Sequence, residues 1–120
     1  MKDLSAPSKK IISLVFKKVK FQDRIAGYAL HGRAGSIRIF LYSLAEVFTL
    51  LNDSDPRIDF TELETWIRNV IKDEELADTL KNIIEMEGSV MDKTQRIREL
   101  IGGRLVQCRQ MAKIRIEERE

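Results

Sequence analysis

The residues best suited to binding a charged ligand lie in one glycine-rich segment. It runs His31, Gly32, Arg33, Ala34, Gly35, Ser36, Ile37 and Arg38, and a strongly apolar stretch follows it. The N–H groups that a helix leaves unpaired at its N-terminus attract anions, and glycine lets a ligand approach the backbone closely. With Arg33, Arg38 and His31 beside such groups, the segment is a candidate anion or nucleic-acid site. The alternative is a tight turn in which Ser36 only caps the next helix.

Two of these glycines also match a known pattern. Gly32 and Gly35 fit the bare GxxG of KH domains, in which that loop clamps a nucleic-acid backbone. KH domains continue with a short helix and then strands, whereas a long apolar helix is expected after this segment. We therefore do not assign the chain to that family. The segment is not a nucleotide P-loop either, because it lacks the spacing and the lysine of that motif.

A second candidate for nucleic-acid binding precedes the glycine-rich segment. Lys17, Lys18 and Lys20 are interleaved with Phe16 and Phe21. Cations next to aromatic rings suit a nucleic acid, because the cations contact phosphates and the rings stack on bases. The competing interpretation places both rings in the core and the three lysines on the solvated side of the same element.

Charge is divided into three blocks along the chain. Residues 1–38 carry nine Lys/Arg against two acids, residues 39–92 carry four against thirteen, and residues 93–120 carry eight against four. The basic ends therefore have two candidate ligands: the acidic middle of a partner or a second copy, or the phosphates of a nucleic acid. The third interpretation is that each block is a solvated helix face.

The last predicted helix carries a candidate partner interface. Leu105, Ala112 and Ile116 continue an apolar stripe nearly to the end of the chain, and Arg109 lies next to it. Such a stripe suggests a partner surface, because chain ends otherwise fray into water. The glycine pair at 102–103 interrupts this helix and indicates a bend, a break or a point of close helix approach.

Few residues could perform catalysis or hold a cofactor. His31 and Cys108 are the only histidine and cysteine, and their separation suggests neither a catalytic pair nor a thiolate metal site. Pro56 and a missing glycine argue against a calcium loop at 53–55. We therefore expect no cofactor, no metal and no enzymatic activity.

Length and composition bound the remaining classes. The chain has 120 residues, of which 43% are hydrophobic and 33% charged, which fits one globular domain. Its longest strongly apolar stretch, residues 37–51, includes two charged residues and is shorter than the roughly 20 residues that a membrane-spanning helix needs. The N-terminus lacks the continuous apolar run of a secretory signal. We expect no membrane association and a cytoplasmic location.

Apolar residues recur every three or four positions along most of the chain, which predicts helices. The clearest helix is expected over residues 36–51, which are apolar nearly all round and should lie at the centre of the core. Residues 9–21 fit a helix or a strand, and a helix is favoured because no second convincing strand is found to pair with them. Further helices are expected around 23–30, over 59–71, over 73–87 and from 89 onward.

Local signals mark the ends of these helices. Asp59 and Asp73 directly precede periodic apolar segments and are expected as N-caps. Ser89, with Asp92 three residues later, has the spacing of a capping box and should begin the last helix. Gly88 lies just before it, where a left-handed residue commonly ends a helix.

These observations predict an all-α fold, a compact bundle of about five helices around the central helix 36–51, with a short β or helical basic arm at the N-terminus. Residues 1–120 are expected to form one domain, with a flexible arm over 1–8 and an extended C-terminal helix over 104–120. The favoured function is a non-enzymatic regulator, adaptor or small subunit whose basic ends dock on acidic helical surfaces of a protein partner or of its own copy, as a homo-oligomer. The alternative is an accessory protein that contacts the phosphate backbone of nucleic acid through residues 17–38.

Overall fold

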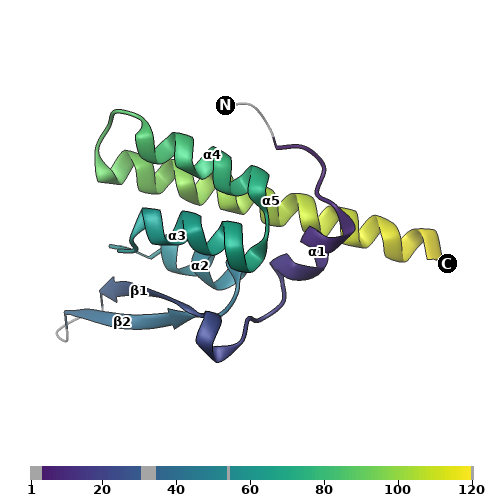
Figure 1. The fold of residues 1–120 in the computed structure, drawn as a ribbon, viewed down its shortest axis with the longest axis horizontal. Helices are drawn as coiled ribbons and strands as arrows, with labels where there is room; N and C mark the ends of the chain where they lie inside the picture. Colours follow the sequence, from purple (N-terminus) through teal and green to yellow (C-terminus); the bar gives the residue numbers. More distant parts are fainter. Residues whose placement is uncertain (1–3, 31–34, 54, 120) are drawn as a thin grey trace.

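The computed structural model describes the backbone of residues 4–30, 35–53 and 55–119, and the side chains of these residues up to 113 apart from Leu30. Figure 1 shows a group of packed helices with a two-stranded ribbon on one side and a long C-terminal helix that extends past them. The elements are α1 (Lys9–Val15), η1 (Phe21–Asp23), β1 (Ile25–Leu30), β2 (Ser36–Leu41), α2 (Leu44–Leu51), α3 (Phe60–Trp66), η3 (Ile67–Ile71), α4 (Glu74–Glu85) and α5 (Val90–Arg119).

The prediction of an all-α fold is wrong, because β1 and β2 form an antiparallel hairpin. The predicted central helix over 36–51 is divided, since Ser36–Leu41 forms β2 and only Leu44–Leu51 is helical. The predicted short helix around 23–30 is mostly β1, which supplies the paired strand that the sequence pattern did not reveal. Within residues 9–21 the favoured helix is present over Lys9–Val15.

Side-chain alternation explains why β2 is a strand. The paired register places Ile25 opposite Leu41, Gly27 opposite Ile39, and Tyr28 opposite Arg38. Polar and apolar residues alternate from Ser36 to Ile39, and two of these residues are β-branched isoleucines, which favours a strand. The same apolar positions fit a helical spacing once they are joined to the apolar residues of α2, which made the segment ambiguous.

A serine separates the strand from the helix that follows it. The hydroxyl of Ser43 accepts a hydrogen bond from the backbone N–H of Glu46 at 3.2 Å and donates one to the Glu46 carboxylate at 3.2 Å. This side-chain pair satisfies an N–H group that would otherwise be unpaired at the start of α2. Ser36, expected as the cap of this helix, lies in β2 instead.

The caps predicted for the later helices are confirmed. The Asp59 carboxylate accepts from the N–H of residue 62 at 3.0 Å, and the Asp73 carboxylate accepts from that of residue 76 at 3.2 Å. The Ser89 hydroxyl accepts from the N–H of Asp92 at 3.1 Å at the start of α5. Gly88 has a positive φ of +145° in the turn between α4 and α5, but it does not end the helix, because α4 already ends at Glu85.

Helix α5 is continuous through its glycine pair and packs against α1, α2 and α4. Gly102 faces the ring of Phe48 on α2, and a Cβ atom added to it would lie 2.7 Å from the ring Cε2. Of the three interpretations of the glycine pair, close helix approach therefore holds. Figure 1 shows that α2 lies between α5 and the hairpin. Among the described residues, no helix has both the length and the apolar character needed to cross a bilayer.

A buried ion pair connects α4, α5 and the N-terminal segment. The Arg104 guanidinium donates to both carboxylate oxygens of Asp73, at 2.7 and 3.0 Å, and the two side chains are 2% and 0% exposed. Arg104 also donates to the carbonyl of Ser5 at 2.7 Å, and Gln107 donates to the carbonyl of Leu4 at 2.9 Å. Burial alone would lower the pKa of Arg104, but its hydrogen bonds with Asp73 raise that pKa above the ordinary value. Leu4 and Ser5, which belong to the segment expected as a flexible arm, thus lie across α5.

The two glycines of α5 give a matched test of the contact with Phe48. Gly102→Ala should lower the free energy of unfolding by about 1–3 kcal/mol, because the new methyl group overlaps the ring. Gly103→Ala meets nothing within 4 Å. It should raise the free energy of unfolding by about 0.5–1 kcal/mol, because alanine favours a helix. Urea denaturation followed by Trp66 fluorescence measures both changes, and equal gains in stability would contradict the close approach.

The ion pair is tested by removing its cation. Arg104→Met should lower the free energy of unfolding by about 3–5 kcal/mol, because it leaves the Asp73 carboxylate buried without a charged partner. Arg96→Met changes an exposed arginine of the same helix and should alter stability by less than about 0.5 kcal/mol. Chemical denaturation compares the two variants. Equal losses would show that the buried pair has no special role.

Candidate nucleic-acid interface

The hairpin sorts its side chains onto two faces, of which the inner one packs against the protein. The inner face carries Ile25, Gly27, Ala29, Ile39 and Leu41, which are buried or partly buried, and at its end Ile37, which is 39% exposed. Gly27 makes the closest approach, since an added Cβ atom would overlap the Leu50 side chain of α2 and lie 3.2 Å from the carbonyl oxygen of Arg57. This contact fixes the ribbon on α2 and turns its other face to solvent.

The outer face presents aromatic rings beside a cation. Tyr28 and Arg38 are directly opposite each other across the two strands, and Phe40 follows on the same face of β2. Tyr28 is 43% exposed and Phe40 is 38% exposed. Large exposed rings on a sheet face are suited to stacking against flat ligands such as nucleic-acid bases.

A further cation and ring extend this face beyond the strands. The Arg24 guanidinium lies between two rings, with its central carbon 3.8 Å from the centroid of Phe21 and 4.3 Å from that of Phe40. The guanidinium carbon of Arg38 lies 5.0 Å from the Phe40 centroid. Arginines and rings therefore alternate along one surface, and Phe21 at its end is 68% exposed. We call Phe21, Arg24, Tyr28, Arg38 and Phe40 the cationic–aromatic face.

The three predicted lysines lie next to this face. Lys17, Lys18 and Lys20 are all exposed, in the irregular segment between α1 and η1. The backbone N–H of Val19 donates to the carbonyl of Tyr42 at 2.7 Å, which holds the lysine segment beside the end of β2. The lysines therefore extend the positive charge of the hairpin in the direction of η1.

The two N-terminal phenylalanines do not lie where the competing interpretation of the sequence placed them. Phe21 and Phe16, 68% and 39% exposed, are not core residues. Phe16 lies apart from the cationic–aromatic face, with the guanidinium carbon of Arg109 on α5 5.9 Å from its ring centroid. Of the two rings interleaved with the lysines, Phe21 is thus the one that joins the candidate interface.

The charge of this region is not neutralised by neighbouring acids. None of Lys17, Lys18, Lys20, Arg24 and Arg38 forms an ion pair with a carboxylate in the described part of the chain. Within the described residues 16–41 the one acid is Asp23, whose backbone carbonyl accepts a hydrogen bond from the Trp66 indole at 2.7 Å. In the described part of the chain, this surface therefore carries positive charge that no carboxylate pairs with.

The glycine-rich segment leads into a strand and not into the expected helix. His31, Gly32 and Arg33 lie outside the described residues. Gly35, with a φ of +75°, directly precedes β2, and Arg38 lies within that strand. The described part of the segment leads into a strand, so no helix N-terminus is present there to attract an anion. Arg38 keeps a candidate role through its place on the cationic–aromatic face.

The residues predicted as a partner interface on α5 are divided between core and surface. Leu105 is buried at 5% exposure, and Ala112 is partly buried against the core. Arg109 is exposed, and Ile116 lies on α5 with its side chain outside the description. The start of the stripe already packs inside the protein, so Leu105 offers no surface to a partner in this conformation.

Three important residues of the interface were not singled out from the sequence. They are Arg24, Tyr28 and Phe40, and each owes its position to the hairpin. The alternation of Arg38 and Phe40 with isoleucines was the available signal, because in a strand it places both on one face. Among the described residues, no three His, Cys, Asp or Glu side chains are grouped to hold a metal ion.

Comparisons with known proteins add no assignment. No protein-family model, no curated protein sequence and no solved structure matches this chain at a significant level.

The single cysteine gives a test of the core along α5. Cys108 is fully buried, and burial raises the pKa of its thiol above the ordinary value. A thiol-reactive reagent at pH 8 should modify it at least about 100-fold more slowly in the folded protein than in urea, because it is shielded and protonated. The matched control is Val106→Cys combined with Cys108→Ala, which places a thiol at an exposed position of the same helix. Equal labelling rates for the two folded proteins would contradict the burial.

Proposed function

We propose that this protein binds single-stranded nucleic acid without reading its sequence, through the outer face of the hairpin. The observation that carries the proposal is the gathering of three exposed rings, Phe21, Tyr28 and Phe40, on one surface with Arg24 and Arg38. Proteins that bind single strands combine such rings, which stack on bases, with cations that follow the phosphate backbone.

Single strands fit this surface better than a duplex does. In a duplex the flat faces of the bases are stacked on one another, so exposed rings have nothing to stack on. In a single strand every base offers a flat face, and stacking of this kind tolerates any sequence. Lys17, Lys18 and Lys20 lie beside the rings, where they would meet the phosphates that continue past the stacked bases.

The docking of the basic ends on acidic helical surfaces remains a prediction from the sequence. At the C-terminal end, fewer residues remain for such docking, because Leu105 is in the core. At the N-terminal end, docking would use the same lysine segment that the nucleic-acid proposal uses. The exposed rings favour the nucleic acid, because stacking gives them a role that docking on an acidic helix does not.

The proposal is tested with a fluorescein-labelled oligothymidylate of about 20 nucleotides, long enough for one or two stacking sites. Fluorescence anisotropy should show binding whose log association constant falls with log salt, with a slope of about −0.7 for each phosphate neutralised. Arg38→Ala should flatten that slope by about 0.7. Tyr28→Ala should weaken binding by about 1–3 kcal/mol through lost stacking and leave the slope unchanged.

Matched controls separate these effects from general charge and burial. Lys81→Ala removes an exposed cation of α4, and Val106→Ala trims an exposed apolar residue of α5, both away from the hairpin. Neither change should alter affinity or salt slope. Binding that does not respond to salt, tighter binding to a duplex of equal length, or equal losses in the control variants would each contradict the proposal.

A further inference from the structure

The two outer edges of the hairpin differ in how their backbone groups are paired. On the β1 side, the N–H of Tyr28 donates to the carbonyl of Arg57 at 2.6 Å, and the N–H of Arg57 donates to the carbonyl of Tyr28 at 2.9 Å. On the β2 side, the described chain supplies one hydrogen bond, from Val19 to Tyr42 just beyond the end of the strand. Among the described residues, none pairs with the edge of β2 along Ser36–Phe40, and we call this the open edge.

The pairing pattern shows which groups point outward along this edge. In an antiparallel ladder, pairs of opposite residues that exchange hydrogen bonds alternate with pairs that do not. In the second kind, the N–H and C=O groups of each residue point away from the partner strand. Tyr28 directs both groups to Arg57, so its cross-strand partner Arg38 must direct its own groups away from β1. By the same alternation, Ser36 and Phe40 also present theirs at the open edge. Among the described residues, no side chain bonds to these groups.

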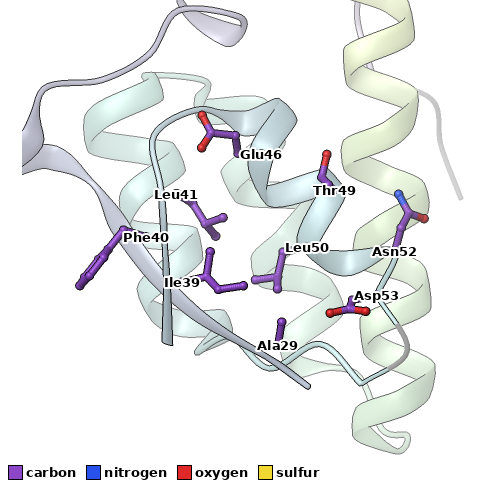
Figure 2. Close-up of a pocket in the computed structure, with 9 residues that line it drawn as sticks. All are labelled: Ala29, Ile39, Phe40, Leu41, Glu46, Thr49, Leu50, Asn52 and Asp53. Atoms are coloured by element: carbon purple, nitrogen blue, oxygen red, sulfur yellow. The ribbon is translucent and has the colours of Figure 1, made fainter. Parts of the chain in front are cut away.

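A groove runs beside the open edge, beneath the inner face of β2. It has a volume of about 500 Å³. Ala29, Ile39, Leu41 and Leu50 point into it, whereas Phe40 points away (Figure 2). Its rim on the side of α2 and the turn after it carries Glu46, Thr49, Asn52 and Asp53. The groove thus has an apolar floor and an acidic rim.

We infer that β2 accepts an extended segment of another protein as a third strand of the sheet. Unpaired N–H and C=O groups along a straight edge are satisfied by another strand, in the mode known as β-strand addition. Every second side chain of the added strand would enter the groove, and we expect these side chains to be apolar because the floor of the groove is apolar. The acidic rim further favours a lysine or arginine on the segment, because no described cation lies within 4.0 Å of the Glu46 carboxylate.

A second copy of this chain fits the groove less well than such a partner does. Its β2 would bring Ile37 and Ile39 toward the groove but no cation toward Glu46. It would also place two cationic–aromatic faces side by side, so that like charges repel. A nucleic acid does not fit either, since phosphates would meet the acidic rim.

The inferred site does not depend on the proposed nucleic-acid binding. The groove side chains lie on the inner face of β2, and the rings and arginines lie on its outer face. Variants confined to the groove can therefore test one proposal and leave the other unaffected.

The probe is a terminally blocked heptapeptide that alternates valine with threonine and carries arginine at both ends. Added to the isotope-labelled intact chain at up to about 1 mM, a concentration suited to a weak strand-addition complex, it should shift the amide signals of Ser36–Phe40 and of α2. The amide protons of Arg38 and Phe40 should then exchange more slowly with solvent, because they become hydrogen-bonded. Absence of binding, or shifts that do not include this edge, would overturn the inference.

Two substitutions test the groove and its charge. Thr49→Trp fills the groove from the exposed side of α2 and should weaken the peptide about tenfold or more. Glu46→Gln keeps the pairing with Ser43 but removes the charge, so it should weaken the arginine peptide about threefold and leave a glutamine-ended peptide unchanged. Glu85→Gln, an exposed carboxylate of α4, is the control and should change nothing.

Two further measurements decide between a partner segment and the other two occupants, a second copy of the chain and a nucleic acid. Sedimentation of the chain alone should give a monomer, and a dimer that Thr49→Trp dissociates would assign the edge to a second copy and overturn the inference. Oligothymidylate binding by Thr49→Trp should equal that of the unmodified chain. If Thr49→Trp weakens oligothymidylate binding and not peptide binding, the groove is part of the nucleic-acid site and the inference is wrong.

Discussion

The ion pair between Arg104 and Asp73 is the constraint that holds the separate parts of the chain in one arrangement. A buried charge is tolerated only when its partner and its hydrogen bonds are complete, so the geometry around these two side chains has little freedom. The Asp73 carboxylate accepts from Arg104 and also caps α4, while Arg104 reaches the carbonyl of Ser5. One side-chain pair therefore sets α5 against α4 and holds the N-terminal segment across both.

The hairpin owes its position to contacts that follow from this arrangement. With α5 fixed, Gly102 admits the ring of Phe48, so α2 approaches α5 closely. On the other side of α2, Gly27 admits Leu50 in the same way and brings the ribbon down onto the helix. Glycine at both contacts removes the one side-chain atom that would separate the elements. The ribbon is thus an outermost layer, and in the described part of the chain its outer face is covered in part by Arg24 and Phe21, while Tyr28 and Phe40 stay exposed.

Local interactions were readable from the sequence, and pairing between distant segments was not. The caps Asp59, Asp73 and Ser89 act on N–H groups three residues away, so their spacing alone identified three helix starts. Ser43 with Glu46 has the same spacing and would have separated β2 from α2. The hairpin was missed because its apolar residues satisfy two periods at once, and only its partner strand decides between them.

The candidate site was predicted in part, for the same reason. The lysines at 17, 18 and 20 and Arg38 were identified as cations, because charge is a property of the residue itself. Whether Phe21 is buried depends on which surface the folded chain leaves for it, and no local pattern reports that. Arg104 shows the reverse case, since it was counted with the basic residues of the last helix but lies in the core. Composition therefore located the charge, and the hairpin determined which rings accompany it.

The β-strand β2 can serve both proposed ligands because its side chains alternate between two faces. Residues 36, 38 and 40 direct their side chains to the outer face and their backbone groups to the open edge. Residues 37, 39 and 41 direct their side chains to the inner face and their backbone groups to β1. A two-stranded ribbon has little stability by itself, and here α2 supports only its inner face. A third strand would add hydrogen bonds at Arg38 and Phe40, which also belong to the cationic–aromatic face. Ordering these residues at the edge reduces the conformational entropy that a nucleic acid must remove when it stacks there, so the two ligands would favour each other's binding.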